Sequence, residues 1–200
     1  MAGLIGVFGG TFDPPHLGHL VLADEGRAAC RLTRVLFVVT GQPPHKPDEP
    51  ISPIGERLAM VEAAIRGNPA FVISRADVDR PGPHYALDTL RWLAERDPRS
   101  SFVYLMGADS LRDLPTWHAP AEFVAACAFV GVMRRPDVEL DVPVLEKQLP
   151  GLTAKVRFFD APLMDIAAHD IRSRVRGGRP YRYLVSQGVA DIIERQGLYL

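Results

Sequence analysis

Short, continuous apolar runs alternate along the chain with longer stretches that mix apolar and charged residues. The apolar runs cover residues 4–8, 35–39, 71–73, 102–106, 128–132 and 156–159. Continuous runs rich in Val, Ile, Leu and Phe are typical of parallel strands that are covered on both faces. Amphipathic patterns over 20–31, 52–65, 87–95 and 189–195 predict helices between and after these strands.

This order of elements predicts a doubly wound parallel α/β sheet with right-handed crossovers. We expect a single domain over 1–200 in which residues 166–200 form a small C-terminal helical part. Ser52 is predicted to cap the second helix, with Pro53 at its first position. The stretch 137–155 predicts no more than a connecting helix.

Composition limits the classes of partner. The 200 residues are 47% hydrophobic and carry a formal charge of −1, so no basic field for nucleic acid exists, and anions must be bound by local His, Lys and Arg. The two cysteines, the lack of a signal-peptide pattern and the lack of an apolar run of about eighteen residues predict a cytoplasmic protein with free thiols and no membrane partner. The expected partners are small molecules; a homo-oligomer is left open.

The first apolar run leads into Gly9-Gly10-Thr11-Phe12-Asp13-Pro14-Pro15-His16-Leu17-Gly18-His19. Two glycines let a ligand approach the backbone, and the helix start that follows offers free N–H groups to an anion. His16 and His19 share one face of the first helical turn, so the stretch suits a phosphate. The alternatives are an exposed helix start or half of a metal site. Catalytic zinc needs a third ligand that this stretch does not supply, so we assign no metal ligands.

The stretch lacks both the P-loop pattern and the G-x-G-x-x-G fingerprint. It resembles the G-G-[ST]-F-D-P-x-H-x-G-H signature of the nucleotidyltransferase superfamily, which includes adenylyltransferases and HIGH-type aminoacyl-tRNA synthetases. With Thr11 and Pro14-Pro15, it is most similar to the bacterial nicotinate mononucleotide adenylyltransferases. The pantetheine-phosphate adenylyltransferases are the nearest family to exclude. This resemblance implies a Rossmann-like fold.

Further segments extend the resemblance over nearly the whole chain. They include Pro43-Pro44-His45-Lys46, Gly107-Ala108-Asp109-Ser110-Leu111, Leu114-Pro115-Thr116-Trp117, Arg134-Arg135-Pro136 and Ile166-Ala167-Ala168-His169-Asp170-Ile171-Arg172. The chain departs from the family at His84, Ala86, Asp137, Ala167 and Ser186. On chemistry alone, Asp109 either binds ribose hydroxyls or caps a helix, and Trp117 either stacks on a ring or belongs to the core. The resemblance favours the ligand roles.

The resemblance implies adenylyl transfer from ATP, carried with Mg²⁺, to nicotinate mononucleotide. The implied catalytic residues are His16, His19, Lys46 and Arg172. The implied ATP-binding residues are Gly9, Gly10, Thr11, Phe12, His16, His19, Gly107, Asp109, Ile171 and Arg172. The implied mononucleotide-binding residues are Thr40, His45, Lys46, Tyr85, Ala86, Trp117, His118 and Arg134.

Two functions of other classes are weighed against this one. An NAD(P)-dependent oxidoreductase shares the architecture, but the glycine fingerprint is missing and Thr40 stands where an acidic residue would be expected. A non-catalytic nucleotide-binding regulator would use the same phosphate ligands as the transferase, so the motifs do not distinguish the two.

Overall fold

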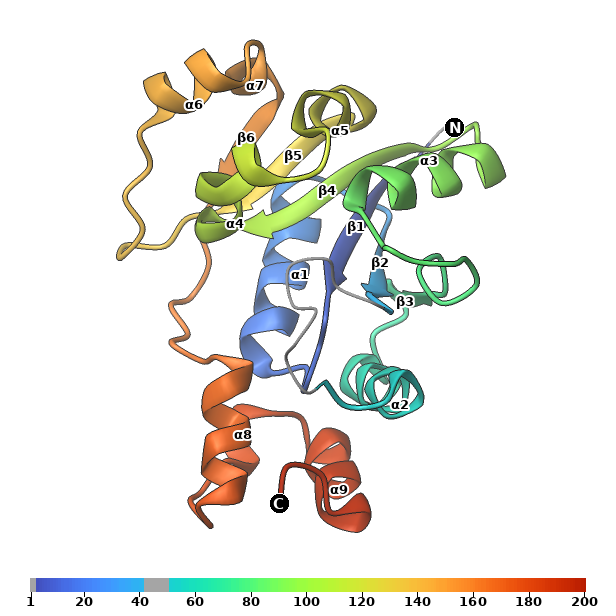
Figure 1. The fold of residues 1–200 in the computed structure, drawn as a ribbon, viewed down its shortest axis with the longest axis vertical. Helices are drawn as coiled ribbons and strands as arrows, with labels where there is room; N and C mark the ends of the chain where they lie inside the picture. Colours follow the sequence, from blue (N-terminus) through green and yellow to red (C-terminus); the bar gives the residue numbers. More distant parts are fainter. Residues whose placement is uncertain (1–2, 42–50) are drawn as a thin grey trace.

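The computed structural model describes residues 3–41 and 51–200. Within them, a parallel sheet of six strands runs in the order β3-β2-β1-β4-β5-β6 (Figure 1). The strands are β1 (Leu4–Gly10), β2 (Arg34–Val39), β3 (Phe71–Ser74), β4 (Ser101–Gly107), β5 (Phe129–Met133) and β6 (Val156–Phe159). Each strand coincides with one of the apolar runs, although β5 begins one residue after the start of its run. The predicted doubly wound α/β sheet is confirmed.

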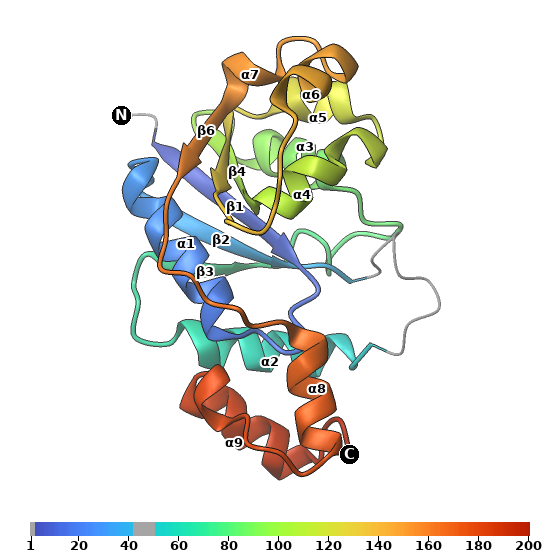
Figure 2. The same ribbon diagram turned by 90° about the vertical axis from the view of Figure 1, so that its left-hand side faces the viewer.

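Helices cover both faces of the sheet (Figure 2). The first face packs against α1 (Leu17–Ala29) and α2 (Ile54–Ile65). The second face is covered by α3 (Ala86–Arg96), α4 (Ala108–Asp113), the 3₁₀ turn η1 (Leu114–Thr116), α5 (Pro120–Ala126), α6 (Val142–Gln148) and α7 (Leu152–Lys155). The chain ends in α8 (Ala168–Arg176), the 3₁₀ turn η2 (Arg182–Leu184) and α9 (Gln187–Gln196).

The continuous apolar runs supply two cores at once, because successive strand residues point to opposite faces. Along β2, Phe37 and Val39 join the cluster under α1 and α2, whereas Leu36 and Val38 join the cluster under α3 to α7. All four side chains are buried. A strand buried on both sides needs no polar alternation, which is why its sequence reads as one apolar block.

A third cluster lies away from the sheet and joins the C-terminal helices to α2. Met60 of α2 packs there with Ile171 of α8 and with Val189 and Ile193 of α9. In Figure 2, α8 and α9 accordingly lie beside α2, at the end of the molecule opposite α6 and α7. The expected C-terminal helices are therefore present, and they pack against α2.

Two details differ from the expectations. The helix predicted over 20–31 begins at Leu17 and ends at Ala29. The cap of α2 is Pro53, with no side-chain hydrogen bond, so the predicted cap role of Ser52 is wrong. The Ser52 N–H instead donates to Asp13 Oδ2 over 3.0 Å, and this ties the start of α2 to the loop after β1.

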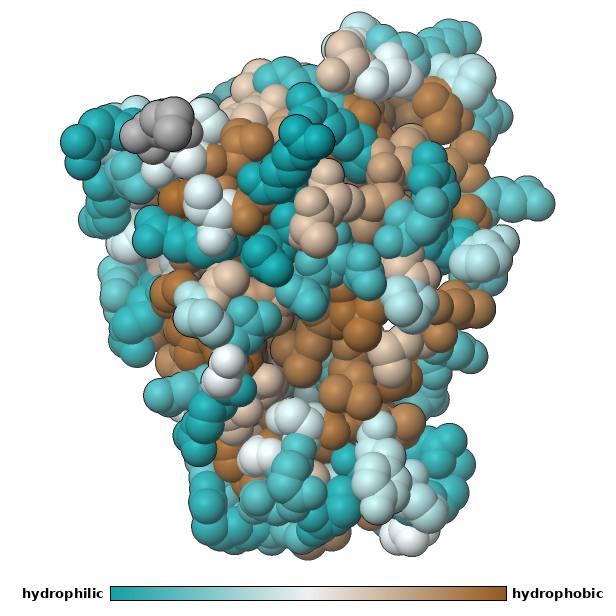
Figure 3. Space-filling view, turned by 180° about the vertical axis from the view of Figure 1, so that it is seen from behind, coloured by the Kyte–Doolittle hydropathy of each residue, from teal (hydrophilic) through white to brown (hydrophobic). Residues whose placement is uncertain are grey.

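The surface mixes polar and apolar residues. Seen from behind, apolar residues gather toward the middle of the molecule, among polar ones (Figure 3). The most exposed large apolar side chains in the described ranges are Leu163, Tyr183 and Leu200. None of the helices described is long and apolar enough to span a bilayer.

Candidate active site

The site lies where the chain leaves the centre of the sheet in two directions. The β1 and β4 strands are neighbours, but the connection after β1 leads to β2 and the one after β4 leads to β5. In open α/β sheets such a divergence leaves a crevice at the carboxyl ends of the strands. A cavity of about 330 Å³ occupies this position. Among the predicted site residues it is lined by Gly9, Gly10, Thr11, Thr40, Tyr85, Ala86, Gly107, Trp117 and His118.

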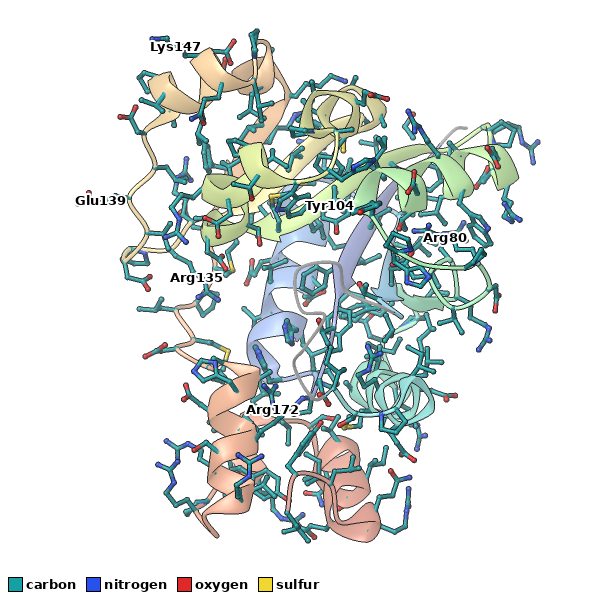
Figure 4. All side chains as sticks on the ribbon, in the orientation of Figure 1. Arg80, Tyr104, Arg135, Glu139, Lys147 and Arg172 are labelled. Atoms are coloured by element: carbon teal, nitrogen blue, oxygen red, sulfur yellow. The ribbon has the colours of Figure 1, made fainter. Side chains whose placement is uncertain are left out.

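The glycines at the end of β1 are required by close neighbours. A Cβ on Gly9 would collide with the Tyr104 hydroxyl, which Figure 4 shows above β1, and a Cβ on Gly10 would meet the Phe12 ring at 2.9 Å. Phe12 turns back under the loop with a φ of 50° and is 2% exposed, in contact with Phe8 and Phe37. The buried Phe12 side chain therefore packs beneath the loop.

The two histidines of the loop form one stacked unit at the start of α1. His16 is the N-cap residue, and its ring stacks on that of His19 with centroids 3.6 Å apart. The backbone N–H of His16 donates to His19 Nδ1 over 3.2 Å, so the proton of a neutral His19 ring sits on Nε2. His16 Nδ1 is buried without a hydrogen-bond partner in the described structure. Gly18 leaves room beside this atom, because a Cβ there would lie 3.1 Å from it.

Burial keeps both imidazoles uncharged. Desolvation, with a smaller contribution from the Arg135 guanidinium, lowers the pKa of His16 to about 4. Desolvation, followed by His16 and Arg135, holds the pKa of His19 well below its usual value. Near neutral pH the pair therefore acts through N–H donors and not through positive charge.

Arg57 of α2 holds the backbone around the crevice. It is 2% exposed, and its guanidinium donates to the carbonyls of Thr11, Thr40, Gly41 and Ser52 over 2.7 to 3.2 Å. One side chain thus joins the loop after β1 to the loop after β2. The sequence analysis missed Arg57, because an arginine in an amphipathic helix carries no signal of burial.

Arg172 reaches the same loop from the C-terminal helices. Its Nη1 donates to the carbonyl of Asp13 over 2.7 Å, and Figure 4 shows it where α8 meets the loop after β1. The neighbouring Ile171 is fully buried in the third cluster, and its N–H donates to the Ala167 carbonyl. The buried Ile171 side chain anchors the helix that carries Arg172, and its predicted contact with ATP stays a prediction.

Aromatic rings form the wall of the cavity on the α3 side. The rings of Tyr85 and His118 stack with centroids 4.1 Å apart. Trp117 meets Tyr104 edge-on at 6.1 Å and Phe123 at 5.2 Å, and it is half-buried. Trp117 therefore packs against the core and also lines the cavity, and its stacking on a ligand ring stays a prediction. Ala86 is the first residue of α3, at a helix start that favours an anion.

At the end of β4 the carboxylate of Asp109 lies against Gly107. Gly107 is the N-cap of α4, and no side chain caps that helix, so the capping alternative for Asp109 is wrong. A Cβ on Gly107 would collide with Asp109 Oδ1, so the glycine makes room for this carboxylate. Asp109 is half-buried and belongs to the first turn of α4, next to the cavity residue Gly107.

Comparison with known proteins agrees with this geometry. Residues 7–194 match the cytidylyltransferase-like family. A protein of Thermomicrobium roseum named "Probable nicotinate-nucleotide adenylyltransferase" is 48% identical over 98% of this chain and 91% of its own length. A protein of the same name from Geobacillus kaustophilus is 41% identical over 98% and 86%.

The chain belongs to the nicotinate-nucleotide adenylyltransferase family. Its fold is also that of the Plasmodium falciparum nicotinic acid mononucleotide adenylyltransferase solved in complex with NaAD. That structure has a TM-score of 0.80 and 17% identity, with 98% of this chain and 97% of the other covered. At this identity the likeness concerns the fold alone.

Within this adenylyltransferase fold, the arginine that faces the histidines is Arg135. Arg134 is exposed, pairs with Asp160 over 3.3 Å and lies over the Phe158 ring. Arg134 does not line the cavity at the carboxyl ends of the strands, and its predicted contact with the mononucleotide stays a prediction. Arg135, labelled in Figure 4, is half-buried and close enough to lower the pKa of both histidines, and it forms no ion pair with another described residue.

Two predicted ligands, His45 and Lys46, lie outside the described residues. In the ranges 3–41 and 51–200, no three His, Cys, Asp or Glu side chains gather in a way that could hold a metal ion. Cys30 and Cys127 are buried and free.

Proposed function

We propose that this chain transfers the adenylyl group of ATP to nicotinate mononucleotide, giving nicotinate adenine dinucleotide and pyrophosphate. The observation that carries the proposal is the uncharged, stacked pair His16 and His19 at the start of α1. The pair follows the glycine turn after β1, and that turn lines the aromatic cavity together with residues of β2 and β4. The names of the relatives support the choice of substrates.

The reaction makes few demands on the protein. A phosphate oxygen of the mononucleotide attacks the α-phosphorus of ATP, the new P–O bond forms, and the bond to the β-phosphate bridge breaks with its electrons going to pyrophosphate. The nucleophile is already an anion, so no base has to remove a proton from it. Catalysis therefore consists of in-line positioning and stabilisation of the leaving charge.

The α1 start and the surrounding cations would perform this stabilisation. The Nε2–H of His19 and the free N–H groups of α1 would donate to the phosphates as charge moves toward pyrophosphate. Arg135 and Arg172 would hold the outer phosphates from the two sides, together with Lys46. Mg²⁺ would enter bound to ATP as part of the substrate, because it favours phosphate oxygens and water over an all-protein cage.

The aromatic wall would hold the pyridine ring. Trp117 and the Tyr85–His118 stack offer flat faces. The first N–H groups of α3, at Ala86, would receive the ring carboxylate, and Thr40 would bound the cavity on the β2 side. Asp109 would accept ribose hydroxyls of ATP beside Gly107.

Incubating the protein with ATP and Mg²⁺ tests the proposal in parallel arms. With nicotinate mononucleotide we expect equal amounts of pyrophosphate and dinucleotide. Pyrophosphate formed faster with phosphopantetheine or with nicotinamide mononucleotide would reassign the acceptor. Binding of ATP without product in any arm would leave a nucleotide-binding regulator and refute the transferase.

A further inference from the structure

The next-to-last residue of the chain contacts the signature loop. The Tyr199 hydroxyl donates to Asp13 Oδ1 over 2.6 Å, although the two residues are 186 positions apart. Asp13 is 3% exposed, so this hydrogen bond is shielded from water. The Tyr199 ring also contacts α2, because its hydroxyl lies 3.8 Å from Met60 Sδ.

Asp13 is a junction at which three elements meet. Its Oδ1 accepts from Tyr199 of the C-terminal tail, and its Oδ2 accepts from the Ser52 N–H before α2 over 3.0 Å. Its carbonyl accepts from Arg172 of α8 over 2.7 Å. His16 follows three residues later in the same loop. A displacement of Asp13 would therefore move Arg172 and the histidine pair relative to each other.

The charges around this junction explain why a neutral tyrosine is a suitable hydrogen-bond donor to the Asp13 carboxylate. Arg57 and Arg172 lie close by, since the Asp13 carboxylate acts on Arg57 and Arg172 acts on Tyr199. Desolvation and the Asp13 carboxylate raise the pKa of Tyr199, so the hydroxyl keeps its proton and stays a donor. Another cation at this point would add positive charge beside Arg57 and Arg172, whereas a hydroxyl fixes the carboxylate without changing the charge.

We infer that Tyr199 is a positioning residue of the ATP site, acting through Asp13 to hold Arg172 and the signature loop in one arrangement. The inference rests on the proposed function in assigning the phosphates of ATP to Arg172. It predicts that the Tyr199 hydroxyl contributes to ATP binding only while Arg172 is present.

A double-mutant cycle tests this dependence. In the wild-type background, Tyr199→Phe keeps the ring and should raise the KM for ATP about tenfold, as the loss of a buried hydrogen bond to a charged group allows. The KM for the mononucleotide should change less than about twofold. In the Arg172→Ala background, the same Tyr199→Phe change should alter the KM for ATP less than about twofold.

Tyr181→Phe is the matched control, because the Tyr181 hydroxyl lies in the same helical part but contacts Glu194 at 3.5 Å, away from the signature loop. It should leave both KM values unchanged. An equal effect of Tyr199→Phe in both backgrounds, no effect in either, or a fall in melting temperature of more than about 10 °C would each overturn the inference. If the wild type forms no pyrophosphate, the proposed function fails, and the same cycle scored by calorimetric ATP binding still decides the role of Tyr199.

Discussion

The protonation state and the contacts of a single residue in this site decide what that residue can do. His16 is the clearest case. Its pKa is about 4 in the folded chain, against an ordinary value of 6.5 in the unfolded chain. Between these two pH values the unfolded chain holds a proton that the folded chain does not, so stability falls as the pH drops from about 6.5 toward 4.

His16→Gln should remove this dependence. Between pH 7 and pH 4.5 the unfolding free energy of the wild type should fall by about 2 kcal/mol more than that of the variant, as follows from the linkage of protons to unfolding. Urea denaturation at the two pH values measures the difference. His118→Gln, which removes an exposed histidine, is the control and should behave as the wild type does. If the unfolding free energies of the wild type and of His16→Gln fall by the same amount, then the pKa of His16 is not lowered on folding.

The adjacent arginines give the second prediction at this scale. Arg134 is already paired with Asp160, whereas Arg135 faces the histidine pair. Arg135→Gln should raise the KM for ATP about tenfold, in keeping with the strength of charge-assisted hydrogen bonds, while Arg134→Gln changes it less than about twofold. Steady-state kinetics on the two variants decides the matter. The reverse order of effects would assign the contact with ATP to Arg134 in place of Arg135.

At the scale of elements, α2 joins the loops after β1 and β2 through one buried arginine, Arg57. Arg57→Met leaves the carbonyls of Thr11, Thr40 and Gly41 without their donor, and should lower the unfolding free energy by about 3 kcal/mol. Arg57→Lys should recover only part of this loss, because one ammonium group does not reproduce the planar fork. Urea denaturation compares both with Arg66→Met, a change of an exposed arginine at the end of the same helix. A fully stable Arg57→Lys would contradict the fork argument.

The strands and helices could be predicted from the sequence. A strand that is buried on both faces needs a continuous apolar run, and such a run is visible in the sequence itself. The glycine turn and the histidine pair were likewise within reach, since both lie in one short segment. The residues of the aromatic wall come from two separate segments, and the family resemblance is what named Tyr85 and His118. Arg57 and the Asp13–Tyr199 contact were not, because they depend on polar contacts across 46 and 186 positions that no periodicity records. The different surroundings of Arg134 and Arg135 have the same origin. Adjacent residues after a strand end face different ways, and only the three-dimensional path of the chain decides which one faces the site.

At the scale of the whole molecule, the ATP side of the site is assembled from two ends of the chain. The signature loop follows β1, whereas Arg172 belongs to α8, and α8 is held in place by the cluster that α2 shares with α9. Figures 1 and 2 show these helices as a group beside α2 and not on the sheet. The packing of α9 on α2 should therefore affect ATP binding from a distance, although neither helix contributes a residue that touches ATP in the proposed mechanism.

Gly188 offers a direct test of this coupling. It lies at the start of α9 against α2, where a Cβ would meet the Cβ of Ala63 at 3.0 Å. Gly188→Leu should separate the two helices and lower the unfolding free energy by about 1 to 3 kcal/mol, the usual cost of overpacking. Because α8 then shifts with Arg172, the KM for ATP should rise while the KM for the mononucleotide, bound on the α3 side, stays unchanged. Gly55→Leu is the control, since Gly55 is an exposed α2 residue with no neighbouring atom within 4 Å of its Cβ position. If Gly188→Leu raises both KM values alike, the C-terminal helices support the fold as a whole and not the ATP side of the site.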